Sequence, residues 1–227
     1  MPKSKRERKV TLSKTISKGR SRKESLLDQV RECVDQFSSA IVFTVDNMRG
    51  AALKQVRAHL KTSRLFFGRN KLMAAALGRT SSDEYRDNLH VVTGHLLHGG
   101  EAGIIFTDDS VATIRGVLSE CQVPEFARAG ASATRDVEVH ASDISHFAPS
   151  MEPFLRKLGL PTRLTGGCVT LLGDYTVCKE GDVLRSEQAK LLQLLGIKMA
   201  VFSLSLSCCW SRDGSFEEYV ERKPQSS

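Results

Sequence analysis

Residues 64–79, RLFFGRNKLMAAALGR, predict a complete strand, turn and helix. The apolar run at residues 65–67 is typical of a short buried strand, and a glycine interrupts it. Asn70 is a residue type favoured at helix N-caps, and residues 72–77 are rich in Ala, Leu and Met, the strongest helix formers. Gly78 predicts the end of this helix. The segment is therefore a strand–turn–helix unit with cations at its turn.

Two of these cations flank Asn70. Arg69 and Lys71 lie at a predicted helix N-terminus, where the helix dipole already places partial positive charge and disfavours a cation. Free backbone N–H groups, the dipole and two long cationic side chains can together hold a phosphate group. The alternative is that both are solvated surface charges, and the spacing alone leaves both interpretations open.

A basic N-terminal segment carries most of the positive charge. The 227 residues have a net charge of +7 and a pI of about 9.2. Residues 1–23 contain ten Lys or Arg and one acid, a charge of +9, so the rest of the chain sums to −2. We expect residues 1–20 to be a disordered arm that binds nucleic acid, acts as a nuclear import signal, or does both. A solvated tail without a partner is the alternative.

Predicted helices and strands alternate through residues 21–124. A capping-box pattern, S-x-x-E, begins at Ser21 and predicts a helix start there. Residues 40–45 form an apolar, β-branched run without alternation, which predicts a strand covered on both faces. Further strands are predicted at 65–67 and 102–107, and further helices from Gly50, Asn70, Ser82 and the capping pair Asp108-Asp109. This order predicts a compact α/β sandwich.

Residues 125–199 predict a smaller α+β module. Its predicted elements are a strand at 137–140, a helix at 153–158, a β-hairpin of 168–172 with 175–179, and a helix from Ser186. Residues 202–210 then alternate strictly, which predicts a strand whose apolar face is Phe202, Leu204, Leu206, Cys208 and Trp210. The residue pattern leaves open whether this strand extends the second module or completes the first sheet.

The chain has no recognisable catalytic, metal or cofactor motif. It lacks a P-loop and a nucleophile elbow, and none of its six cysteines forms a CxxC pair. It also lacks a signal peptide and a membrane-length apolar run, so we expect free, buried or half-buried thiols in a reducing compartment, nucleus or cytosol. The residues alone favour a non-enzymatic α/β protein, without cofactor or metal, whose basic arm binds RNA or DNA.

Several unusual sequence words match a known family. The first group is Val45-Asp46-Asn47, Gln55-Val56-Arg57, residues 67–73 (FGRNKLM), Val123-Pro124 and residues 158–162 (LGLPT). With these words the chain resembles the P-zero/L-ten family of stalk-base proteins of the large ribosomal subunit. A second group is residues 63–68 (SRLFFG), 82–85 (SDEY), 87–90 (DNLH), 150–153 (SMEP) and 177–184 (VCKEGDVL). These resemble the ribosome-assembly paralogues of P-zero, the mRNA turnover protein four family.

The resemblance implies an α/β first domain that holds the stalk-base segment of large-subunit rRNA, with a second domain inserted before the last part of its sheet. We accordingly expect a basic arm at 1–20 and an rRNA-binding domain at 21–124, completed by 200–221. An inserted α+β domain is expected at 125–199 and a tail at 222–227. The strand and hairpin from residue 202 to 220 would then return to the first domain.

The same resemblance implies a nuclear and nucleolar assembly factor that is not an enzyme. It would occupy the stalk site on pre-large-subunit particles, beside neighbouring ribosomal proteins and assembly factors, until P-zero replaces it. P-zero continues into helices for acidic stalk proteins, so we expect this chain to bind neither those proteins nor a membrane. The assembly paralogues often end in an acidic tail, whereas residues 222–227 are not acidic. A structural stalk-base protein of mature ribosomes and an RNA-modifying enzyme stay open as alternatives.

The expected RNA contacts are cations of the arm and of the first domain. They would bind phosphates and RNA shape rather than base sequence. Asn70 either caps its helix or donates a hydrogen bond to RNA. The full set is Lys3, Lys5, Arg6, Arg8, Lys9, Lys14, Lys18, Arg20, Arg22, Lys23, Arg49, Lys54, Arg57, Arg64, Arg69, Asn70 and Lys71.

Overall fold

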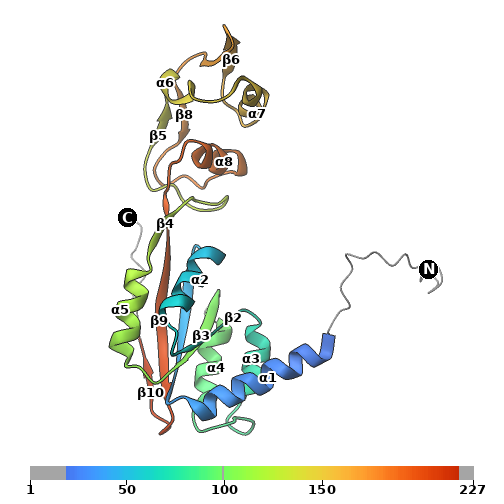
Figure 1. Cartoon of the computed structure of the whole chain (residues 1–227), viewed down its shortest axis with the longest axis vertical. Helices are drawn as coiled ribbons and strands as arrows, with labels where there is room; N and C mark the ends of the chain where they lie inside the picture. Colours follow the sequence, from blue (N-terminus) through green and yellow to red (C-terminus); the bar gives the residue numbers. More distant parts are fainter. Residues whose placement is uncertain (1–18, 99, 220–227) are drawn as a thin grey trace, which may run out of the picture.

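The computed structural model describes residues 19–98 and 100–219, which form two lobes (Figure 1). The strands of the larger lobe are β1 (Ser39–Asp46), β2 (Arg64–Phe67), β3 (Ala102–Thr107), β4 (Val123–Glu125), β9 (Ala200–Ser211) and β10 (Phe216–Glu218). They form a sheet of order β10-β9-β1-β3-β2, in which every neighbouring pair is antiparallel, and β4 pairs with the opposite end of β9. Because β4 and β9 run side by side to the second lobe, they connect the two lobes.

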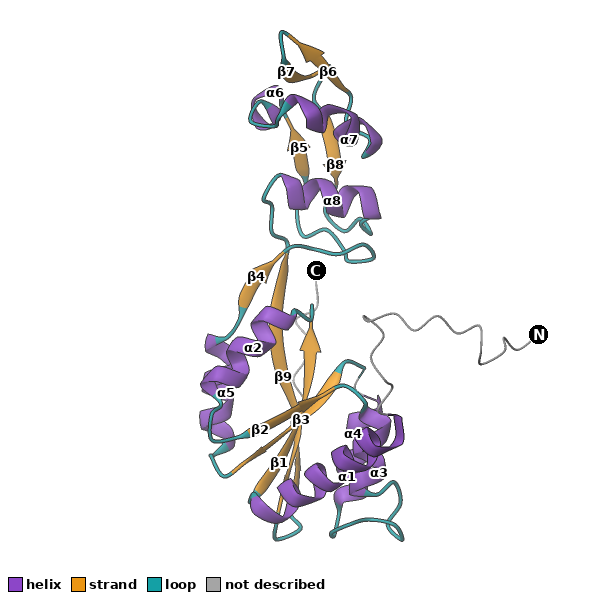
Figure 2. Cartoon of the chain, turned by 45° about the vertical axis from the view of Figure 1, so that its right-hand side comes forward, coloured by secondary structure: helices purple, strands orange, loops and turns teal. Residues whose placement is uncertain are grey.

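Helices cover both faces of this sheet (Figure 2). On one face lie α1 (Gly19–Gln36), α3 (Asn70–Leu77) and α4 (Leu89–His98). On the other face lie α2 (Gly50–His59) and α5 (Val111–Glu120). The α/β sandwich predicted from the sequence is therefore confirmed.

The central strand β1 supplies side chains to both cores. Val42 packs with Ile104 on the side of α1, α3 and α4, whereas Phe43 packs with Ile105 and Ile114 on the side of α2 and α5. All of these side chains are fully buried. The prediction that residues 40–45 form a strand covered on both faces is confirmed, and the absence of alternation in that run reflects its burial on both sides.

Strand β9 completes the first sheet, as the family resemblance implies, but its apolar residues do not share one face. Ser207 is an extra residue in the pairing of β9 with β1, because Val42 lies opposite Cys208 and Phe43 lies opposite Leu206. Such a bulge shifts the alternation by one residue. Leu206 therefore belongs to the core under α2 and α5, whereas Cys208 and Trp210 belong to the opposite core. The single apolar face predicted for residues 202–210 was wrong for this reason.

The smaller lobe is built around its own apolar core. Leu155, Val169, Val177 and Leu192 are among its buried members. Its elements are β5 (Val137–Val139), α6 (Ala141–Ile144), the 3₁₀ turn η2 (Pro149–Met151), α7 (Glu152–Lys157), β6 (Thr162–Thr165), β7 (Cys168–Leu171), β8 (Tyr175–Cys178) and α8 (Ser186–Leu194). It therefore contains short helices and two-stranded sheets, as an α+β module does.

The hairpin predicted for residues 168–172 and 175–179 was wrong. Strand β7 pairs with β6, through the turn at Gly166-Gly167, and β8 pairs with the distant strand β5. Both turn glycines have positive φ, 58° and 80°, as a tight hairpin turn requires. The sequence offered two glycine-containing turns, and the turn at Gly173-Asp174 instead leads the chain to a different sheet.

Three predicted helix starts were also wrong. Helix α1 begins at Gly19, so Ser21 lies inside the helix instead of at its N-cap. Helix α4 begins at Leu89 and not near Ser82, because residues 80–88 form turns and Asn88 has φ of 65°, outside the helical region. The N-cap of α5 is Ser110, whose hydroxyl accepts a hydrogen bond from the Thr113 N–H, and not the preceding aspartates.

Candidate nucleic-acid interface

The turn between β2 and α3 projects two cations from the edge of the sheet. Strand β2 pairs only with β3, so within the described part of the chain it is an edge strand. Arg69 is the N-cap residue of α3, with φ of 58° and ψ of 38°, and its side chain makes no capping bond. A left-handed backbone is unfavourable for a residue other than glycine. Such strain is concentrated at functional positions, which makes this turn the first candidate for a site.

Arg69 and Lys71 are both exposed at this turn. Neither cation has a carboxylate within ion-pair distance among the residues that the structure describes. Their charge is therefore available to an external anion, next to the free N–H groups at the start of α3. The structure brings these two predicted contacts together, and their binding to RNA stays a prediction.

Asn70 has a structural role that the sequence did not predict. It is the first residue of α3 and not its N-cap, so the capping prediction was wrong. Its side-chain Nδ2 donates a hydrogen bond of 3.2 Å to the carbonyl oxygen of Leu96 in α4. Its Oδ1 is buried and has no hydrogen-bond partner among the described residues. Asn70 therefore links α3 to α4, which holds the neighbouring cations in place.

The other predicted cations of the first lobe lie along the edge strand and on α2. Lys54 and Arg57 are exposed on α2. Arg64 is exposed at the start of β2, with its guanidinium 6.0 Å from the centre of the Phe66 ring. Because Arg64 lies opposite Phe106 and Phe67 lies opposite Gly103, Arg64 and Arg69 stand at opposite ends of β2. The cations thus line an edge of the lobe instead of forming one cluster.

Arg49 is already occupied by contacts within the protein. Its guanidinium donates to a carboxylate oxygen of Glu125 at 3.4 Å and to the backbone carbonyls of Phe126 and Met48. Only 18% of its side chain is exposed. Arg49 therefore ties the start of α2 to the segment that leads into the second lobe, and its expected contact with RNA stays a prediction.

Replacing Arg49 by alanine is expected to lower the free energy of unfolding by about 1–3 kcal/mol, because it leaves the half-buried Glu125 without its charged donor. Urea unfolding followed by circular dichroism measures this change. Arg57→Ala is the matched control, since Arg57 is exposed on the same helix and should change stability by less than about 0.5 kcal/mol. Equal effects of the two substitutions would contradict the assigned role of Arg49.

The predicted arm falls mostly outside the described residues. Lys3, Lys5, Arg6, Arg8, Lys9, Lys14 and Lys18 all lie there. Arg20 is within α1, and the next two cations, Arg22 and Lys23, are exposed on the first turns of that helix. The described end of the arm thus begins as helix, two residues earlier than the predicted domain boundary.

The described residues contain no arrangement typical of catalysis or metal binding. No group of three or more His, Cys, Asp or Glu side chains there could hold a metal ion. Five of the six cysteines are buried, as expected, whereas Cys168 is exposed. Burial raises the pKa of Cys208 to about 12, so this thiol stays protonated and is a poor nucleophile. Within the same residues, no helix is long and apolar enough to span a bilayer.

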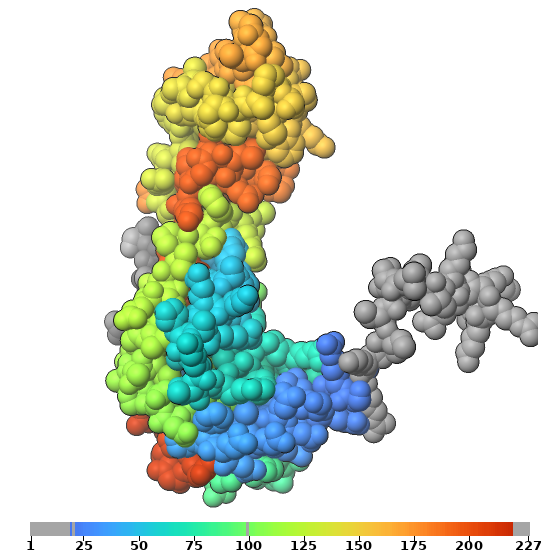
Figure 3. All heavy atoms as spheres, in the orientation of Figure 1, coloured from blue at the N-terminus to red at the C-terminus, as the bar shows by residue number. Residues whose placement is uncertain are grey.

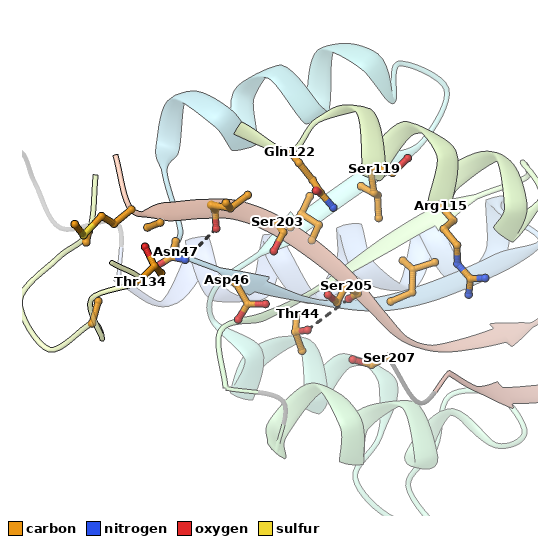
Figure 4. A pocket seen from close by; sticks show the side chains of 18 of the residues that line it. Thr44, Asp46, Asn47, Arg115, Ser119, Gln122, Thr134, Ser203, Ser205 and Ser207 are labelled. Atoms are coloured by element: carbon orange, nitrogen blue, oxygen red, sulfur yellow. Dashed lines mark hydrogen bonds between the residues drawn. The ribbon is translucent and has the colours of Figure 1, made fainter. Parts of the chain in front are cut away.

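A cavity of about 830 Å³ lies along β9 between β4 and β10, beneath α5 (Figure 4). Its lining includes Thr44, whose hydroxyl donates to the Ser205 carbonyl oxygen, and Asn47, whose amide donates to the Val201 carbonyl oxygen at 2.9 Å. These polar groups thus serve the junction of β1 with β9. Among the described residues that line the cavity, no nucleophile is paired with a base, which is the arrangement typical of a hydrolytic enzyme.

Comparison with known proteins matches both lobes. Residues 18–123 match the family model of ribosomal protein L10, and residues 127–197 match that of the insertion domain in the 60S ribosomal protein of the L10 type. The ribosome assembly factor mrt4 of Neurospora crassa is 38% identical, over 93% of this chain and 90% of that protein. The one of Schizosaccharomyces pombe is 37% identical, over 99% and 97%. The chain belongs to the Mrt4 family of ribosome assembly factors.

Membership in the Mrt4 family confirms the resemblance found in the sequence, including the relation to the stalk proteins. Large ribosomal subunit protein uL10 of Saccharomyces cerevisiae is 28% identical over 82% of this chain, but the match covers only 59% of that longer protein. Proteins of the Mrt4 family and the L10 family are named for ribosome assembly and ribosome structure, not for catalysis. The matches therefore support a role in ribosome biogenesis, in agreement with a site made of cations.

Proposed function

We propose that this Mrt4-family protein binds the stalk-base segment of large-subunit rRNA in nuclear and nucleolar pre-ribosomes, as a placeholder that P-zero later replaces. The observation that carries the proposal is the strained turn at Arg69, which presents Arg69 and Lys71 beside the N-terminus of α3 without any described acidic partner. A folded RNA offers closely spaced phosphates to such a surface. The family name supports the assembly role.

In this proposal the two lobes have different roles. Residues 21–124 with 200–221 are the rRNA-binding domain, and residues 125–199 are the inserted domain. The cations at both ends of β2 and on the exposed side of α2 contact phosphates along the edge of the first lobe: Lys54, Arg57, Arg64, Arg69 and Lys71. Asn70 holds the turn in position through Leu96. The basic arm adds sequence-independent attraction to the same polyanion.

Replacement by P-zero follows from competition between two related proteins for one RNA surface. The uL10 similarity spans most of this chain, so the two proteins carry the same kind of first lobe. Two proteins that bind one site exclude each other, and the relative amounts and affinities decide which is bound. This exchange needs no energy source in the chain, in agreement with the absence of a nucleotide-binding motif from its sequence.

Sedimentation of the tagged protein in fractionated nuclear and cytoplasmic extracts tests the proposal. We expect co-sedimentation with nuclear pre-large-subunit particles and absence from translating ribosomes. Presence in polysomes would instead identify a permanent stalk-base component of mature ribosomes. Turnover of RNA by the purified protein would favour the third interpretation, an RNA-modifying enzyme.

A further inference from the structure

A polar cleft of about 460 Å³ separates the start of α2 from α8 in the second lobe. Its lining includes Arg49, the connecting residues Glu125, Phe126 and Arg128, and Lys190 from α8. Figures 1 and 3 both place α8 above α2, and in Figure 3 the yellow-green atoms of the connecting segment lie between them. None of the described residues of the cleft belongs to the set of RNA contacts predicted from sequence except Arg49.

The charges of the cleft do not balance. Glu125 is its one acidic residue among the described lining, and the Arg49 guanidinium already neutralises it. Arg128 and Lys190 are both exposed, and neither has an acidic partner within ion-pair distance in the described chain. A third cation, Lys198, stands 5.8 Å from the centre of the Phe126 ring. The cleft is therefore positively charged, and it suits an anion larger than one carboxylate.

The α8 wall of the cleft is polar and open. Ser186, Ala189, Lys190 and Gln193 face it, at the spacing of one helix surface, whereas Leu191 and Leu192 are buried in the core of the second lobe. The Lys190 ammonium donates to the Gln193 side-chain oxygen at 3.0 Å, and this bond is exposed. A surface of this kind fits a phosphate backbone better than the apolar face of a partner helix.

Contacts across the junction hold the two walls together. Arg128 Nη2 donates to the carbonyl oxygen of Met48 at 3.0 Å, and Arg49 donates to Glu125 and Phe126 from the other side. Helix α2, which begins at this junction, also carries the exposed Lys54 and Arg57. Cations thus continue from the cleft along α2 toward the edge of the first lobe.

We propose that this cleft is a second phosphate-binding surface, by which the second lobe contacts the same folded RNA as the first lobe. The inference rests on the proposed rRNA binding and extends it to residues Arg128, Lys190 and Lys198. A two-lobe contact fixes the orientation of the protein on the RNA, because phosphate contacts position a protein without reading sequence.

Lys190→Glu tests this surface. The full-length variant is expected to bind a transcript of the stalk-base rRNA segment about three- to tenfold more weakly, with a smaller dependence of affinity on salt, because one phosphate contact is lost. Fluorescence anisotropy at several salt concentrations measures both quantities. Lys190→Gln, which removes the charge without reversing it, is expected to weaken binding less. Circular dichroism checks that the variants are folded.

Lys157→Glu is the matched control, because Lys157 is an exposed cation on α7, away from the cleft in the second lobe (Figure 1). It should bind RNA like the unchanged protein. Equal weakening by Lys157→Glu and Lys190→Glu would overturn the inference, since only overall charge would then matter. Unchanged binding by Lys190→Glu, together with weaker binding by Arg69→Glu/Lys71→Glu, would overturn the second surface alone. Unchanged binding in both would overturn the proposed function as well.

Discussion

The double substitution Arg69→Glu/Lys71→Glu is expected to weaken binding to the stalk-base RNA transcript by about ten- to a hundredfold at low salt. The reason is that it removes two exposed cations and places two carboxylates beside RNA phosphates. The slope of affinity against salt concentration should also flatten by about two released counterions. Measurements of binding over a range of salt concentrations give both numbers.

Lys157→Glu/Arg163→Glu is the control for this prediction. It changes the net charge by the same amount, also through one Lys and one Arg, and both residues are exposed in the second lobe. Its affinity should therefore fall only slightly, through the general loss of attraction. If the two double variants bind equally well while both remain folded, the turn at Arg69 is not an RNA contact. The cations would then be solvated surface charges, the alternative that the sequence left open.

The strand–turn–helix unit at the candidate site could be predicted from sequence because its signals are local. A short apolar run, a glycine and a run of strong helix formers all act within a few residues. The prediction was displaced by one residue at the turn, since the left-handed conformation falls on Arg69 and Asn70 begins the helix. The bond from Asn70 to Leu96 depends on packing between α3 and α4, which no local signal specifies.

The role of Arg49 shows the limit for a charged residue. Its partners are Glu125 and Phe126, more than 70 residues away in sequence, so an unpaired surface cation and a junction cation look the same in the chain. The cleft beside it was missed for the same reason. Its cations come from three separate segments, and a charge pattern within any one of them is ordinary.

Strand pairing was predicted least well. The bulge at Ser207 exchanges the two faces of β9 although the residues around it alternate without interruption. In the second lobe, β8 pairs with β5 instead of with its neighbour β7. Alternation indicates that a strand has two different faces, but it does not specify the partner strand or a change of register. The tertiary core decides both.

Gly78→Ala is expected to lower the free energy of unfolding by about 2–4 kcal/mol. Gly78 ends α3 with φ of 99°, and a Cβ there would lie 2.3 Å from the Cα of Glu84 and 2.4 Å from the Asp83 carbonyl oxygen. These neighbours are backbone atoms of the turn that the sequence wrongly predicted as helix. The turn is held against α3 by the Tyr85 N–H, which donates to the Leu77 carbonyl oxygen at 2.9 Å. Urea unfolding of the purified protein measures the loss.

Gly116→Ala adds the same methyl group with the opposite expected sign. Gly116 lies inside α5, and a Cβ there would meet no atom within 4 Å. Alanine should therefore stabilise the protein by about 0.5–1 kcal/mol, because it restricts the unfolded chain and favours the helix. Equal stability changes at the two positions would contradict the close contact at Gly78. A large loss at Gly78 alone would mean that the turn after α3 is fixed by backbone packing, which explains why its helix-like sequence does not form a helix.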